Sequence, residues 1–145
     1  MSMCYWMCEG IGVRCDDVYR YLDMNKCLSE IKKLFPDDES LNEYTADTFD
    51  ENAFDDLMYG DFFQCVGDFL SQLDDAGVLS YGDNGDGQSF CYYSPKYPWY
   101  VTDNDPKSLQ EARDLVKAVI RKVCDIDEES LEKILDDDIY EYGCG

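Results

Sequence analysis

The chain has 145 residues, a length that suits one compact domain. Hydrophobic residues make up 45% of it and aromatic residues 14%, which is enough apolar material for a packed core and argues against disorder of the whole chain. The formal net charge is −21, far beyond the roughly 2–8 units that keep a small domain soluble. Such a charge disfavours direct binding to nucleic acid or to an anionic membrane surface.

The first predicted elements are a strand and a helix. The opening fifteen residues predict a short strand or hairpin around Gly10 and Gly12. An amphipathic helix should follow, because Asp23 suits the N-cap, apolar residues then recur at helical spacing, and Pro36 ends the pattern. The polar, acidic segment after Pro36 is expected to form a loop with a short helix.

Two helices and a hairpin are expected next. The helices run from Asp50 to Tyr59 and from Asp61 to a stop near Gly77. The hairpin pairs Val78–Tyr81 with Ser89–Tyr93. This helix–helix–hairpin order resembles a winged helix, although it lacks the basic residues that DNA binding requires.

The last third predicts an extended segment and two helices. Residues 98–102 are expected to be extended, and Asp105 and Pro106 to open a helix that carries most of the remaining basic residues. Asp127 suits the N-cap of a final helix that continues toward Ile139, followed by a frayed tail. The predicted fold is therefore a single α+β domain over residues 1–145, with about five helices and a small antiparallel sheet.

The chemistry of the chain does not predict an enzyme. Histidine is absent, so no catalytic triad, Cys–His dyad or imidazole base can form. The eight cysteines are expected to be free and mostly buried, because the start of the chain lacks the pattern of a secretory signal. Only Cys4, Cys8 and Cys15 are close in sequence, and their spacing does not fit a zinc site. We therefore predict no catalytic residue, no metal and no cofactor.

The negative charge is concentrated in one stretch of the sequence. Residues 1–33 contain five acidic and five basic residues, whereas residues 34–95 contain fifteen acidic residues and no Lys or Arg. Residues 96–145 contain thirteen acidic and seven basic residues. The acids of the central stretch thus have no basic partner nearby in the sequence.

The central carboxylates are the predicted partner-binding residues, with the role of replacing phosphate charges against Lys and Arg of a partner. They are Asp47, Asp50, Glu51, Asp55, Asp56, Asp61, Asp68, Asp74, Asp75, Asp83 and Asp86. The C-terminal run 136–138 is the alternative acidic surface. Aromatic residues among the acids are candidate anchors for the same partner: Tyr44, Phe49, Tyr59 and Tyr81.

In its size, its acidity and its base-free central stretch, the chain resembles the small acidic DNA-mimic proteins of phages and mobile elements, which act against CRISPR effectors or restriction enzymes. The resemblance is to this class and carries no residue-level correspondence. It implies an inhibitor in the cytoplasm of a bacterial host that occupies the nucleic-acid-binding surface of a nuclease complex. The alternatives are an immunity protein or antitoxin that neutralises one basic toxin, and a phage interaction protein that is not an inhibitor. A homodimer is compatible with the apolar share of the chain.

Overall fold

The fold is built on one antiparallel sheet. A computed structural model of the chain describes residues 5–60, 62–83 and 88–144. Its four strands are β1 (Tyr5–Arg14), β2 (Ser80–Asp83), β3 (Ser89–Tyr93) and β4 (Leu135–Cys144), in the spatial order β2-β3-β1-β4. The described part also has six α-helices and two 3-10 helices, so the predicted α+β class is confirmed.

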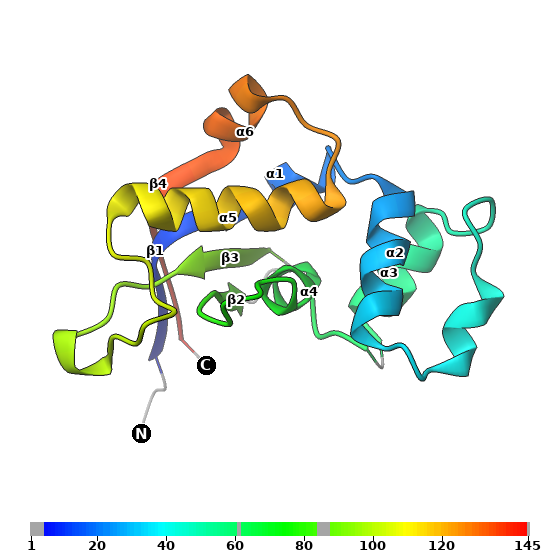
Figure 1. Cartoon of the computed structure of the whole chain (residues 1–145), viewed down its shortest axis with the longest axis horizontal. Helices are drawn as coiled ribbons and strands as arrows, with labels where there is room; N and C mark the ends of the chain where they lie inside the picture. Colours follow the sequence, from blue (N-terminus) through cyan, green and yellow to red (C-terminus); the bar gives the residue numbers. More distant parts are fainter. Residues whose placement is uncertain (1–4, 61, 84–87, 145) are drawn as a thin grey trace.

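The helices lie around the sheet and at one end of it (Figure 1). Figure 1 places α2 and α3 at one end of the long axis, opposite the strands β1 and β4, while α5 runs along the sheet. None of the helices in the described ranges combines the length and apolar character needed to cross a bilayer. The helices are α1 (Cys15–Tyr19), α2 (Met24–Leu34), η1 (Glu39–Glu43), α3 (Glu51–Met58), α4 (Val66–Gln72), η2 (Pro98–Tyr100), α5 (Leu109–Val123) and α6 (Glu128–Ile134).

Three helix starts are where the sequence predicts them, because the signal is local. Asp23, Asp50 and Asp127 accept hydrogen bonds from backbone N–H groups in the first turns of α2, α3 and α6. Such caps satisfy donors that have no partner inside the helix. The short helix expected after Pro36 is η1.

The N-terminal segment is one long strand and not a hairpin. Gly10 and Gly12 lie inside β1, where the pairing with β4 shifts register at a β-bulge. Gly10 has a φ of +149°, and a Cβ there would lie 1.9 Å from the carbonyl oxygen of Tyr93. Glycine is therefore needed at this position for close strand contact, and not for a turn.

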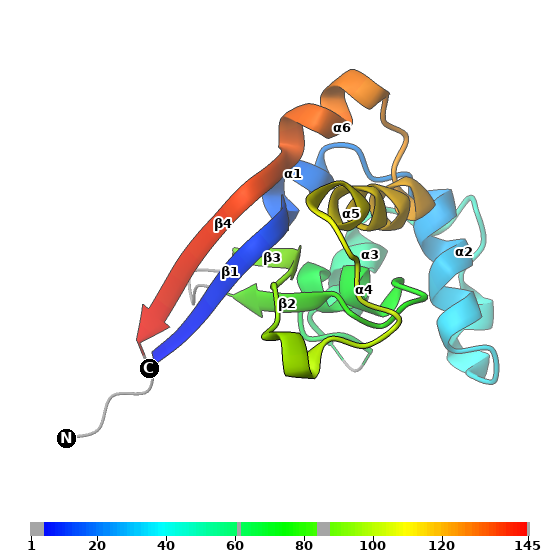
Figure 2. The same ribbon diagram turned by 60° about the vertical axis from the view of Figure 1, so that its left-hand side comes forward.

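The predictions of a helix that continues toward Ile139 and of a frayed tail are wrong. Helix α6 ends at Ile134, and the next ten residues form β4, which pairs antiparallel with β1. Figure 2 shows the two strands running side by side away from the helices. The run of three aspartates enters a strand because Asp136 pairs with Arg14 and Asp137 pairs with Arg113, which offsets repulsion along the strand.

Four other elements differ from the prediction. The fourth helix begins at Val66, eight residues before the buried Asp74, and its expected cap at Asp61 lies outside the described residues. The segment expected to be extended at 98–102 begins as the 3-10 turn η2. Helix α5 is capped by Ser108, whose side chain accepts from the Glu111 N–H, so Asp105 and Pro106 precede the helix. The first hairpin strand is displaced from Val78–Tyr81 to Ser80–Asp83.

The main core joins the helices to one face of the sheet. Edge-to-face ring contacts connect Tyr19, Phe54 and Phe69, and so tie α1, α3 and α4 together. A smaller cluster of Phe90, Tyr92 and Ile139 lies apart from this core. Because alternate side chains of a strand point to opposite faces, the sheet buries apolar residues on both sides.

Candidate partner-binding surface

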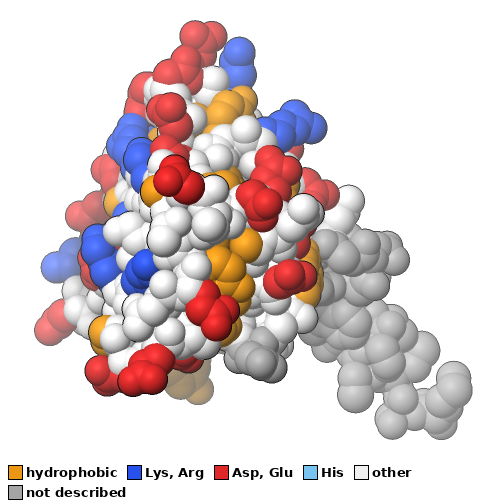
Figure 3. Space-filling view, turned by 90° about the vertical axis from the view of Figure 1, so that its right-hand side faces the viewer, with side chains coloured by type: hydrophobic (Ala, Val, Ile, Leu, Met, Phe, Trp, Pro, Cys, Tyr) orange, Lys and Arg blue, Asp and Glu red, His pale blue; other side chains and the backbone are white. Residues whose placement is uncertain are grey.

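The strongest acidic surface is formed by residues 37–56, which we call the acidic segment. It runs from just after α2 into the first turns of α3 and contains nine carboxylates and no Lys or Arg. Figure 3 shows carboxylates scattered over the side of the molecule that carries α2 and α3, with basic groups along the left edge and in the upper part of the view. Seven of the nine carboxylates are exposed: Asp37, Glu39, Glu43, Asp47, Asp50, Glu51 and Asp56.

The carboxylates of the acidic segment form no ion pair with any described residue. The lysines of the neighbouring helix α2 contact other groups, and one of them, Lys32, contacts the backbone of the acidic segment itself. Lys32 donates to the carbonyl oxygen of Tyr44 at 2.9 Å, Lys26 donates to that of Cys124 at 2.8 Å, and Lys33 pairs with Glu30. The Lys32 ammonium therefore lies against the segment's backbone, but the carboxylates themselves have no basic partner among the described residues.

Local hydrogen bonds fix the backbone that presents these charges. Asp38 accepts from the Ser40 N–H at 2.9 Å, and Asp50 accepts from the Ala53 N–H at 2.9 Å. Asp55 is half-buried and accepts from the Tyr19 hydroxyl at 3.0 Å. These three acids both hold the segment in shape and add to its field.

The prediction that Asp74 binds a partner is wrong. Its side chain is 7% exposed and accepts hydrogen bonds from the N–H groups of Ala76, Val78 and Leu79. It closes the turn after α4 and cannot reach a partner. The neighbouring Asp75 is exposed, but Lys122 of α5 pairs with it at 3.1 Å. Asp75, an acid of the base-free stretch, thus has a basic partner in Lys122, which is distant in the sequence.

The other predicted site residues lie apart from the acidic segment. Asp68 is half-buried in α4 and accepts from the Gln64 N–H and from the Gln72 amide. Asp83 ends β2. Asp61 and Asp86 lie outside the described residues. The structure therefore brings five of the predicted acids together: Asp47, Asp50, Glu51, Asp55 and Asp56.

Six described acids of the C-terminal third form ion pairs within the molecule. Arg113 pairs with Glu132 and Asp137, and the buried Lys117 pairs with Glu132 and, at 2.9 Å, with Glu128. Lys117 lowers the pKa of the Glu132 carboxyl by donating to it. In the alternative surface 136–138, two of three carboxylates are engaged in this way, because Arg14 also holds Asp136 and lowers its pKa. The acidic segment is therefore the better candidate surface.

The predicted aromatic anchors divide by exposure. Phe49 is buried and packs edge-to-face against the half-buried Tyr44, so Phe49 belongs to the core. Tyr81 is half-buried in β2, and Tyr59, at the end of α3, is exposed. The sequence analysis missed the most exposed aromatic side chains, which lie at positions 97, 99 and 100.

Five described cysteines are buried and free: Cys15, Cys27, Cys65, Cys91 and Cys124. Burial raises the pKa of Cys15 and of Cys124 to about 12, and that of Cys91 well above its usual range. These thiols stay neutral and pack as small hydrophobes. Cys4 lies outside the described residues, and no group of three metal-ligating side chains occurs in the described part of the chain.

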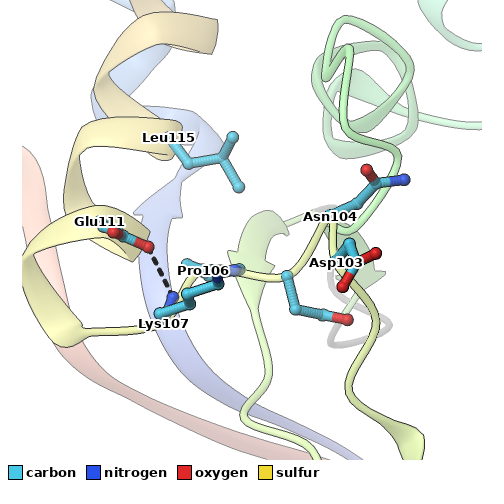
Figure 4. A pocket seen from close by; sticks show the side chains of 7 residues that line it. Asp103, Asn104, Pro106, Lys107, Glu111 and Leu115 are labelled. Atoms are coloured by element: carbon cyan, nitrogen blue, oxygen red, sulfur yellow. Dashed lines mark hydrogen bonds between the residues drawn. The ribbon is translucent and has the colours of Figure 1, made fainter.

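A pocket lies between the loop before α5 and the start of that helix (Figure 4). Two of its carboxylates already have partners within the chain. Glu111 accepts from the backbone N–H of Lys107 at 2.7 Å, and Asp105 accepts from the Thr102 N–H at 2.7 Å. These contacts shape the loop and leave no organised ligand site. Comparison of the chain with family models, with curated proteins and with solved structures found no match.

Proposed function

We propose that this protein is an inhibitor that binds the basic nucleic-acid-binding surface of a nuclease complex, as a DNA mimic. The observation that carries the proposal is the acidic segment, with nine carboxylates, seven of them exposed, and no ion pair to any described residue. By contrast, eight acids elsewhere in the described chain form ion pairs, most of them around α5, α6 and β4. An unpaired array of one sign costs stability through self-repulsion, so its retention favours a role in binding.

The physical basis is competition for the same cations. Duplex DNA presents about one negative charge per 1.7 Å of its axis, and proteins that bind it gather Lys and Arg along a groove. Carboxylates on a fixed backbone can attract that groove over the same range. Electrostatic steering then makes association fast and sensitive to salt.

The test compares two variants of equal charge. In the first, four exposed residues of the acidic segment whose side chains make no described hydrogen bond are reversed: Glu43→Lys, Asp47→Lys, Glu51→Lys and Asp56→Lys. In the second, four exposed acids outside the segment are reversed: Asp16→Lys, Asp114→Lys, Asp125→Lys and Glu129→Lys. Each set of four reversals adds eight units and changes the net charge from −21 to −13.

Both variants and the wild type are used as bait for bacterial lysate, with elution by a salt gradient. We expect the wild type and the second variant to retain a nucleic-acid-binding complex that competing duplex DNA releases, and the first variant to lose it. Equal loss in both variants would show that net charge alone drives binding and would contradict the assignment to this surface. Retention of one small basic toxin through high salt would favour the immunity-protein alternative.

A further inference from the structure

A second exposed surface lies on the connection between β3 and α5. Residues 97–101, which we call the aromatic loop, expose Trp99 to 73%, Tyr97 to 68% and Tyr100 to 64%, and Val101 is exposed beside them. Single exposed apolar residues need no explanation, but large ones that adjoin each other are typical of binding sites. The acidic segment does not include this loop.

The aromatic loop is ordered by its own contacts. The rings of Tyr97 and Trp99 stack with centroids 5.0 Å apart and an angle of 2° between their planes. Behind them, the buried Asp105 accepts from the Thr102 N–H at 2.7 Å and from the Thr102 hydroxyl at 2.9 Å, and its carboxylate pairs with Lys96 at 2.9 Å. A flat platform held in this way loses little conformational entropy when a ligand stacks on it.

Two adjoining grooves extend this surface toward carboxylates. The first contains Val101 of the aromatic loop together with Lys96 and Lys107, and the second contains Glu9, Asp137 and Asp138. Both grooves are lined by Ile11, Pro95 and Leu109. An apolar floor therefore leads from the aromatic loop to an acidic end.

The charges of these grooves favour a cationic occupant at the acidic end. Lys96 is neutralised by Asp105, and Asp137 is held by Arg113. Glu9 and Asp138 are both exposed, and neither forms an ion pair with a described residue. Because the whole chain carries −21, a polyanion such as single-stranded nucleic acid is repelled even though its bases could stack on the rings.

We propose that the aromatic loop and the acidic groove beside it bind an arginine-bearing segment of a basic polypeptide. The guanidinium group is planar, stacks on aromatic faces and pairs with carboxylates, and the indole ring is the strongest cation–π partner among the aromatic side chains. One arginine would stack on Trp99, and the next along an extended segment would reach Glu9 and Asp138. This inference rests on the proposed function: the basic partner proposed there would present arginine to the aromatic loop, a surface separate from the acidic segment.

The test uses nona-arginine and nona-lysine peptides as probes of equal charge. Trp6→Phe leaves Trp99 as the only tryptophan, so its fluorescence reports the aromatic loop. We expect nona-arginine to change this fluorescence and to bind more tightly than nona-lysine. Calorimetry measures the affinity of Trp99→Ala for both peptides. The substitution should weaken the binding of nona-arginine about two- to fivefold, the range of an exposed cation–π contact, and should weaken the binding of nona-lysine by a smaller factor.

The control variants separate this inference from general acidity. Trp99→Phe should retain part of the preference for arginine, because the phenyl ring still offers a weaker cation–π face. An unchanged preference in Trp99→Ala would overturn the inference, as would self-association of the free protein that Trp99→Ala abolishes. The variant reversed at positions 43, 47, 51 and 56 should bind both peptides more weakly, and by the same factor. If that variant binds them as the wild type does while Trp99→Ala weakens binding, the proposed function is contradicted and this inference stands.

Discussion

Asp74 and Asp75 are adjacent acids with different roles, and only the environment of each carboxylate separates them. Asp74 is buried and satisfies three backbone N–H groups after α4. The side chain of Asp75 is 94% exposed and makes one long ion pair with Lys122. A carboxylate that holds a turn contributes to stability, whereas an exposed ion pair contributes little.

We therefore expect Asp74→Ala to lower the free energy of unfolding by about 1–3 kcal/mol, because it leaves the buried N–H groups of Val78 and Leu79 without an acceptor. Asp75→Ala should change it by less than about 0.5 kcal/mol. Urea denaturation measures both values. Equal effects of the two substitutions would contradict the structural role of Asp74.

Asp105 gives a prediction for pH. Its pKa is lowered to about 2 from an ordinary value of 3.8, first by the backbone N–H of Thr102 and next by Lys96. Because the folded-state pKa lies below the unfolded one, the contribution of Asp105 to stability is present above about pH 4 and is lost as the pH falls through about 2. The tether of the aromatic loop should thus persist at pH 3.

An NMR titration of the Asp105 carboxyl should give a midpoint near 2. Lys96→Met should raise this midpoint but leave it below 3.8, since the Thr102 N–H still donates to the carboxylate. A wild-type midpoint at or above 3.8 would show that the loop is not tethered by this group in solution.

At the scale of elements, the success of the sequence predictions depends on how local the signal is. Helices α2 and α3 were predicted well because an aspartate cap and a helical stripe lie within each segment. Strand β4 could not be predicted, because two of its three aspartates pair with Arg14 and Arg113, which are distant in the sequence. The glycines of β1 suggested a hairpin, because glycine serves both in turns and where strands approach closely.

Gly10 provides a test of the close contact between β1 and β3. Gly10→Ala should lower the free energy of unfolding by more than about 4 kcal/mol or prevent folding, because a Cβ would overlap the Tyr93 carbonyl and the φ of +149° is unfavourable for alanine. Gly77→Ala is the matched control. It has a φ of +68° but open space around the added Cβ, so we expect a loss of only about 1–2 kcal/mol. Thermal and chemical denaturation compare the two, and a small effect at Gly10 would contradict the strand packing.

At the scale of the whole molecule, the candidate site was only partly readable from the sequence. The base-free stretch is visible in the order of residues, and it led to the acidic segment. The burial of Asp74, the pairing of Asp75 and the exposure of Trp99 depend on tertiary contacts that no local pattern encodes. In the fold, basic residues on α5 pair with acids of α6 and β4, whereas the acidic segment at the far end of the molecule has no such pairs among the described residues (Figure 1).

The most direct test of DNA mimicry is a competition on the complex that the protein captures. A fluorescent duplex is first bound to that complex, and the protein is then added while the anisotropy of the duplex is followed. We predict full displacement of the duplex by the wild type, weaker displacement at higher salt, and none by the variant reversed at positions 43, 47, 51 and 56. A ternary complex in which the duplex and the protein are bound together would contradict the proposal.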